Sequence, residues 1–192
     1  MKNIQLISLL IMLCLPTISS AQKTLENNKP EITPKWLQSH FEFLTNGTGR
    51  WIADNSKYKN ENEPFDEYGT EWTWGVGKQS IKGHLFGIKD KKEVGTFWEY
   101  RVFWHPKEKR AIYEQFGTWG VFATGEMRVI ELFNSKSENN VELTFYSPDG
   151  SSWKDLHKLI ENNDEHTTQS YNFKDGSWKP QRTYIWKRIA LK

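Results

Sequence analysis

The chain has 192 residues, a formal net charge of +2 and a single cysteine, Cys14. A chain of this length fits one domain whose core is large enough to fold without disulfide bonds. The charge is close to neutral and no strong basic patch stands out, which argues against nucleic acid as a partner.

Residues 1–21 have the pattern of a secretory signal peptide: a single lysine, an apolar run over residues 4–15, and small residues ending at Ala21. This pattern predicts cleavage after Ala21 and export to the periplasm or the exterior. The apolar run is shorter than the ~20 residues that span a bilayer, so no membrane insertion is expected after the signal is removed. The alternative is a lipoprotein anchored through Cys14, although Leu13 occupies a position where such sites usually carry a small residue.

Residues 22–32 are polar and lack periodicity, which predicts a flexible leader before a single domain over residues 33–192. The stretch TPKWLQSHFEFL, residues 33–44, predicts a short helix. Thr33 is suited to cap it and Pro34 to occupy the first helical position. Its apolar face is formed by residues at helical spacing, namely Trp36, Leu37, His40, Phe41 and Leu44.

The rest of the chain is rich in aromatic and β-branched residues, with turn residues about every 8 to 15 positions, as in antiparallel sandwiches and barrels. An up-and-down sheet of this length tends to close, because closure removes the exposed edges. The predicted fold is therefore all-β, a closed up-and-down barrel of about ten strands with a short N-terminal helix. The predicted strands are 49–56, 66–75, 79–88, 94–104, 111–117, 120–131, 140–147, 151–161, 165–174 and 178–189.

The helix is followed by FLTNGTGRW, whose Gly49-Arg50-Trp51 opens the first strand. This order resembles the calycin superfamily of lipocalins, fatty-acid-binding proteins and bacterial lipocalin-like barrels. Ten strands are most similar to its fatty-acid-binding and nitrobindin-like members. The resemblance implies that Trp51 packs across the closed end of the barrel under an arginine from the last strand. The candidates for that arginine are Arg182 and Arg188.

The register of strand 94–104 decides which of its side chains line the barrel. Phe97 and Phe103 share a face with Glu99 and Arg101, so this face is predicted to be luminal, with Glu99 and Arg101 paired inside. Glu114 on the next strand is expected opposite them. With the reverse register, the pocket belongs to Trp98, Tyr100 and Trp104.

The aromatic content of 15% favours a pocket for a small molecule, because such pockets combine aromatic walls with a few fixed polar groups. The leading hypothesis is an exported, lipocalin-like protein that binds a small, partly apolar ligand and is not an enzyme. The expected ligand-binding residues are Trp72, Trp74, His84, Trp98, Glu99, Arg101, Tyr113, Tyr171 and Tyr184.

Two alternatives remain open. The first is an isomerase, cyclase or lyase with Glu99 or Glu114 as base and His84 or Tyr113 as acid. The second is a haem or nitric-oxide-binding barrel, which the nitrobindin resemblance implies, with His157 as the proximal ligand. The sequence carries no recognised nucleophile, phosphate-loop or metal-ligand motif, so no metal and no cofactor are predicted.

Overall fold

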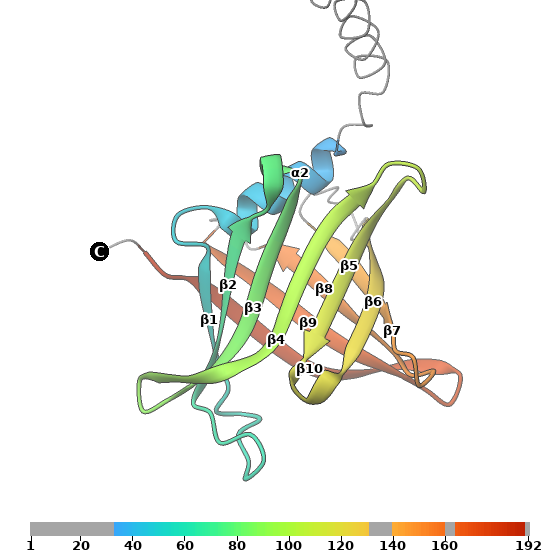
Figure 1. The fold of residues 1–192 in the computed structure, drawn as a ribbon. Helices are drawn as coiled ribbons and strands as arrows, with labels where there is room; N and C mark the ends of the chain where they lie inside the picture. The colour runs from blue at the N-terminus through green and yellow to red at the C-terminus, as the bar shows by residue number, and fades with distance from the viewer. Residues whose placement is uncertain (1–32, 131–139, 160–163, 191–192) are drawn as a thin grey trace, which may run out of the picture. The chain divides into compact units, whose positions relative to one another are not determined.

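The computed structural model describes residues 33–130, 140–159 and 164–190. The predicted signal peptide, 1–21, and leader, 22–32, lie outside the described residues. The described part of the chain forms a closed antiparallel barrel of ten strands with one short helix, which confirms the predicted fold class (Figure 1).

Each strand pairs with its neighbours in sequence, and the first strand closes the barrel against the last through Trp51 opposite Arg188. The predicted strands match the observed ones to within a few residues. The strands are β1 (Arg50–Asp54), β2 (Glu67–Trp74), β3 (Ser80–Lys89), β4 (Lys92–His105), β5 (Arg110–Gly117), β6 (Phe122–Val129), β7 (Val141–Tyr146), β8 (Ser152–Leu159), β9 (Glu165–Lys174) and β10 (Ser177–Arg188). Single 3₁₀ turns, η1 (Val76–Lys78) and η2 (Thr118–Gly120), follow β2 and β5.

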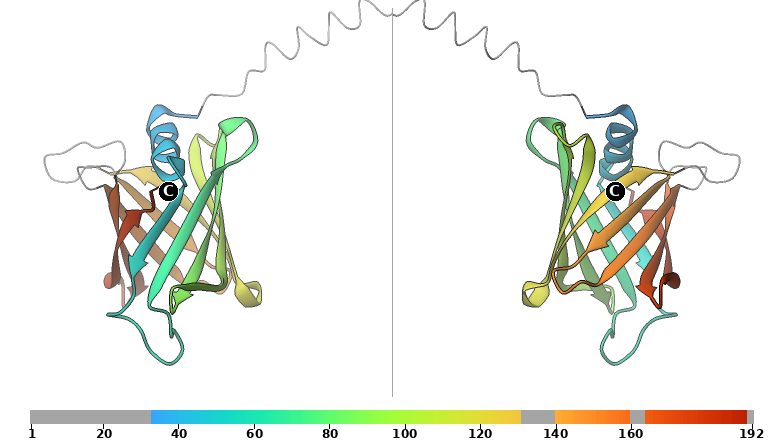
Figure 2. Two further views of the ribbon diagram at one scale, coloured as in Figure 1. Left: turned by 90° about the vertical axis from the view of Figure 1, so that its left-hand side faces the viewer. Right: turned by 90° about the vertical axis from the view of Figure 1, so that its right-hand side faces the viewer.

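Helix α2 (Lys35–Thr45) lies across one end of the barrel, and the loop of residues 55–66 extends from the other end (Figures 1 and 2). The predicted cap is wrong: Pro34 is the N-cap residue, and the Thr33 hydroxyl donates a hydrogen bond to Gln79 Oε1 at 3.0 Å instead. This bond ties the start of the helix to the turn before β3. No helix in the described ranges has the length and apolar character needed to cross a membrane.

The end of the barrel under α2 is closed by Trp51, which is completely buried. Its indole Nε1 donates to the Leu44 carbonyl at 3.0 Å, and the Arg188 guanidinium lies 4.1 Å from its ring centroid. Gly49 precedes it at φ +65°, and a Cβ there would lie 2.1 Å from the Trp72 carbonyl oxygen. Only glycine fits both the backbone conformation and the close approach. The expected stacking of an arginine on Trp51 is therefore made by Arg188.

A bulge in β4 reverses the predicted register. Leu85 of β3 pairs with Trp98, but Phe86 pairs with Thr96, so Phe97 is an extra residue in β4. Two consecutive β4 residues at a bulge depart from simple alternation. Phe97 therefore packs inward, against Phe65 with ring centroids 4.9 Å apart, although the rest of its predicted face points outward.

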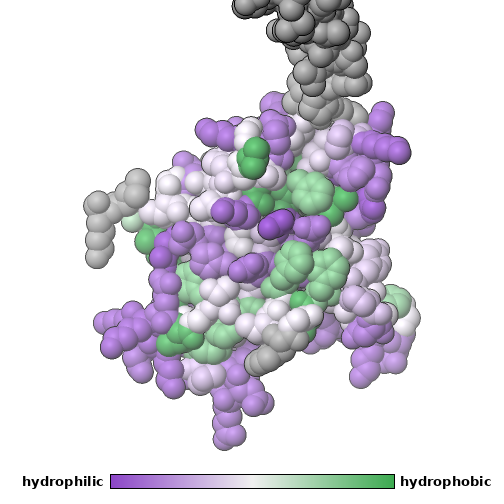
Figure 3. Space-filling view, in the orientation of Figure 1, coloured by the Kyte–Doolittle hydropathy of each residue, from purple (hydrophilic) through white to green (hydrophobic). Residues whose placement is uncertain are grey.

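The prediction that Glu99 and Arg101 are luminal is wrong, because both are exposed on the outer wall. The opposite face points inward and carries Tyr100 and the fully buried Val102. In the space-filling view, polar side chains alternate with apolar ones over this outer surface of the barrel (Figure 3).

Candidate ligand-binding site inside the barrel

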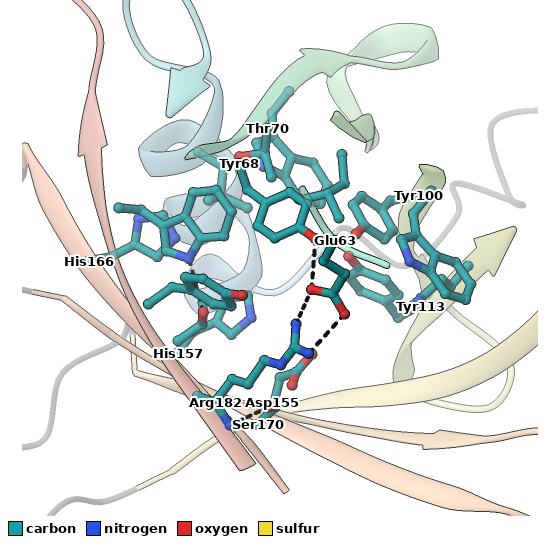
Figure 4. Close-up of a pocket in the computed structure, with 18 residues that line it drawn as sticks. Glu63, Tyr68, Thr70, Tyr100, Tyr113, Asp155, His157, His166, Ser170 and Arg182 are labelled. Carbon is teal, nitrogen blue, oxygen red and sulfur yellow. Dashed lines mark hydrogen bonds and ion pairs between the residues drawn. The ribbon is translucent and has the colours of Figure 1, made fainter. Parts of the chain in front are cut away.

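The barrel encloses a cavity of about 300 Å³ between α2 and the 55–66 loop (Figure 4). Its lining comes from both of these segments and from strands β2–β5 and β8–β10. The alternation of inward and outward side chains along a barrel strand delivers two or three residues from most of these strands. The cavity lies at the lower end of the size range of small-molecule pockets.

Aromatic rings make up much of the wall. Trp72 stacks on Tyr100 with centroids 5.5 Å apart, and Tyr100 lies 5.6 Å from Tyr113. Across the cavity, Tyr184 lies 5.8 Å from Trp186. These mutual contacts hold the rings in place, so the aromatic part of the wall is formed before any ligand arrives.

Asp155 of β8 faces this cavity together with Tyr100 and Tyr113 (Figure 4). Within the described part of the chain its carboxylate makes no hydrogen bond or ion pair. Burial raises the pKa of Asp155 to about 7, and burial also raises the pKa of both tyrosines above that of an ordinary phenol. Asp155 is only partly buried and lines the cavity, so its carboxyl group is open to a partner that enters the cavity.

Three histidines cluster between the cavity and the closed end. His157 of β8 lies 6.1 Å from His40 of α2 and 6.0 Å from His166 of β9, measured between ring centroids. Burial lowers the pKa of His40 to about 3 and of His157 to about 4, and it lowers that of His166, so all three are neutral at pH 7. Nδ1 of each ring is buried without a hydrogen-bond partner among the described residues.

The histidine cluster does not form a metal centre in this conformation, because no described group of three His, Cys, Asp or Glu side chains has metal-binding geometry. The haem alternative stays a prediction: His157, its expected proximal ligand, has His40 and His166 as ring neighbours.

The end of the cavity away from α2 is bounded by an ion pair. Arg182 of β10 donates to both oxygens of Glu63 at 2.5 and 2.8 Å, and the Tyr68 hydroxyl donates to Glu63 at 3.0 Å. The hydrogen bonds from Arg182 lower the pKa of Glu63, so this carboxylate is ionised and matched by one cation. Glu63 belongs to the 55–66 loop, so the pair attaches this loop to the barrel wall.

Four of the predicted ligand-binding residues line the cavity: Trp72, Trp98, Tyr113 and Tyr184. Trp74 does not, and packs instead against Phe41 of α2 at 6.1 Å between ring centroids. Tyr171 lies on the outer wall under Lys154. His84 also lies outside, beside Phe86.

The proposed acid–base residues Glu99, Glu114 and His84 all lie on the outer wall, so only Tyr113 of that set reaches the cavity. Arg182, predicted at the closed end, lies at the opposite end with Glu63.

Several cavity residues lie outside the predicted ligand-binding set, although His157 was predicted as a haem ligand. Trp153, Asp155 and His157 alternate along β8, a pattern that marks one face of a strand, so the sequence held a signal for Asp155. Nothing in the sequence marks Glu63, because a loop residue has no periodicity to read. His166 is equally unmarked, since a lone histidine on a strand more often has a structural role.

Comparison with protein-family models and with curated protein sequences finds no match for this chain.

Proposed function

We propose that this protein is an exported, calycin-like binding protein that holds a small, partly apolar molecule inside its barrel. The single observation that carries the proposal is the cavity of about 300 Å³, in which aromatic walls surround a carboxyl group without a partner. Pockets that bind small molecules have this composition, largely apolar with a few convergent polar groups. A barrel serving only as a scaffold has no need of an unpaired carboxyl group in its interior.

Binding in the lumen is testable with N-phenylnaphthylamine, a neutral dye that fluoresces in apolar surroundings. Thr70 lines the cavity from β2, so Thr70→Phe adds a ring to the space the dye needs. Thr73 lies three residues further on the same strand and is exposed on the outer wall, which makes Thr73→Phe the matched control. We expect the wild type and Thr73→Phe to bind the dye and Thr70→Phe to bind it weakly. Equal binding by all three would place the dye elsewhere and count against the proposal.

Export is a separate part of the proposal and rests on residues 1–21. Mass measurement of the mature protein should give a chain that begins at Gln22, recovered from the soluble fraction. Cys14→Ser should change neither the mass nor the fraction. A lipid-modified N-terminus lost in Cys14→Ser would establish the lipoprotein alternative instead.

A second candidate function is acid–base catalysis in the same cavity, now with Asp155 in place of the carboxylates on the outer wall. The observation in its favour is a carboxyl with a pKa of about 7 beside Tyr100 and Tyr113, because a general base is most effective near the operating pH. Small molecules extracted from the purified protein provide the test. Their conversion on incubation with wild type, and not with Asp155→Asn, would make the protein an enzyme. If the extracted molecules are recovered unchanged, binding without catalysis is favoured.

A further inference from the structure

The charges that face the cavity do not balance. Glu63 is matched by Arg182. The cavity-lining histidines, His157 and His166, are neutral at pH 7 because burial lowers their pKa. Asp155 alone has neither a hydrogen-bond partner nor a counter-ion within the described residues. The cavity is therefore short of one positive charge whenever Asp155 is ionised.

The groups around Asp155 suit a cation better than an anion. Tyr100 and Tyr113 present aromatic rings to the same space (Figure 4), and aromatic rings attract ammonium groups electrostatically. His157 and His166 line the same space as neutral imidazoles, so they bring no positive charge that would compete with a cation. An anionic ligand would meet the Asp155 charge, and the one arginine in the lining is already engaged by Glu63.

We propose that the ligand of this cavity is a small organic cation whose ammonium group pairs with the Asp155 carboxylate and lies against the rings of Tyr100 and Tyr113. This inference rests on the proposed binding function and adds the class of ligand. It gives Asp155 the partner that the folded chain does not supply. The cation also explains how a carboxyl group can be tolerated in a desolvated space, since an opposite charge nearby favours the ionised form.

Matched pairs of probes separate charge from shape. Tyramine carries an ammonium group where para-propylphenol carries a methyl group, and choline has dimethylbutanol as its neutral carbon isostere. All four compounds are titrated calorimetrically into the wild type, Asp155→Asn and Glu99→Gln. Asp155→Asn keeps the size of the side chain and removes the charge. Glu99→Gln removes a carboxylate from the outer wall and is the control for net charge.

For the wild type and Glu99→Gln we expect at least one cation to bind about tenfold or more tightly than its neutral isostere, a difference of 1.4 kcal/mol or more. In Asp155→Asn the preference should disappear, because the cation loses its counter-ion. Displacement of N-phenylnaphthylamine by the cation, measured on the same samples, places the cation in the lumen.

The pH dependence of choline binding gives a readout that a purely structural role of Asp155 would not change. Choline keeps its charge at every pH, so any change in its affinity comes from the protein. Binding should tighten as pH rises through about 7, where Asp155 ionises, and Asp155→Asn should lack this dependence. The other titratable or charged groups facing the cavity are Glu63, Tyr68, Tyr100, Tyr113, His157, His166, Arg182 and Tyr184, and Asp155→Asn leaves all of them in place.

The outcomes are distinct. Equal affinity for cation and neutral isostere, or the same preference in Asp155→Asn, overturns the inference and leaves the proposed binding function standing. Dye binding in the lumen that no cation displaces overturns it in the same way. If the dye also fails to bind, the proposed function fails with it.

Discussion

Two arginines on strand β10 lie at opposite ends of the barrel and have different structural roles. Arg188 is largely buried, with 9% of its side chain exposed, while 37% of the Arg182 side chain is exposed. Arg188 donates to the carbonyls of Phe43 and Asn46 at the end of α2 and stacks on Trp51. It thereby satisfies carbonyls that a helix terminus leaves without partners. Arg182 instead holds the carboxylate of Glu63 on a loop.

The comparison teaches that Arg188 belongs to the packed core at one end of the barrel, whereas Arg182 makes a partly exposed ion pair at the other. At the closed end, the helix, Trp51 and Arg188 form one packed unit with buried hydrogen bonds. At the other end, the 55–66 loop is held to the wall by the packing of Phe65 on Phe97, by hydrogen bonds to Tyr58 and Asn55, and by the Glu63–Arg182 ion pair. The ion pair is partly exposed, and such pairs contribute little to stability. We therefore expect ligand entry past the Glu63–Arg182 pair and no entry past α2.

The largest expected effect comes from removing the indole at the closed end. Trp51→Ala deletes a fully buried side chain and its hydrogen bond to Leu44, which should lower the unfolding free energy by about 3–5 kcal/mol. Chemical denaturation measures this loss. Phe173→Ala is the control, because Phe173 is half exposed, and it should cost less than about 1 kcal/mol. A small loss in Trp51→Ala would mean that the closed end is not part of the cooperative core.

Methionine replacements of the two arginines test the comparison directly. Arg188→Met keeps much of the side-chain length but removes the donor to the Phe43 carbonyl, while the Asn46 carbonyl keeps the Gly49 N–H, so it should destabilise the fold by about 1–3 kcal/mol. Arg182→Met should cost at most about 1 kcal/mol and should speed the release of N-phenylnaphthylamine from the lumen. Stopped-flow dilution measures that rate. Faster release from Arg188→Met alone would reverse the assignment of the entrance.

Asp155 lies between the two ends and should limit stability above neutral pH. Burial raises the pKa of Asp155 to about 7. The contribution of its carboxyl group to the unfolding free energy is therefore fully present below about pH 4 and is lost as pH rises through about 7. Asp155→Asn should therefore raise the unfolding free energy at about pH 8 by on the order of 2 kcal/mol and change it little near pH 4. Denaturation midpoints across this range measure the effect. An Asp155→Asn protein less stable than wild type at high pH would show that the carboxylate has a partner.

The pH dependence of stability that comes from the histidine cluster beside the closed end should have the opposite sign. The pKa values of His40 and His157 are lowered by burial, so their contribution is present above about pH 6.5 and is lost as pH falls toward about 4. As pH falls below about 6, the unfolding free energy of the wild type should decrease by roughly 1 kcal/mol per pH unit more than that of His40→Leu. His105→Leu serves as the control, because His105 lies in the β4–β5 hairpin outside the cluster. Identical slopes for wild type and His40→Leu would mean that His40 is already protonated in the fold.

The sequence predicted the fold well because its signals are local. Turn residues and aromatic, β-branched runs mark each strand, and short hairpins leave little choice of topology. The position of Trp51 at the closed end was predicted from the resemblance to the calycin group and not from Gly49–Trp51 alone, because a glycine before an aromatic residue is common wherever a turn leads into a strand. Local sequence did not decide whether Arg182 or Arg188 stacks on Trp51, since that depends on how far β10 runs past the lumen.

The candidate site was predicted less well because it depends on register. A single bulge at Phe97 shifts the alternation of β4, so a face that seemed luminal from its two phenylalanines contains exposed Glu99 and Arg101. Counting alternate residues through a bulge inverts every assignment beyond it. Tyr100 was thereby left out of the predicted ligand-binding set.

By itself, the sequence of this protein determined the number and order of the strands and their antiparallel pairing, because turn chemistry and side-chain periodicity act over a few residues. Only the tertiary structure decided which face of each strand points inward, because bulges and the closure of the sheet act over the whole barrel. It also brought together Asp155, Tyr100 and Tyr113, from three strands, around one cavity.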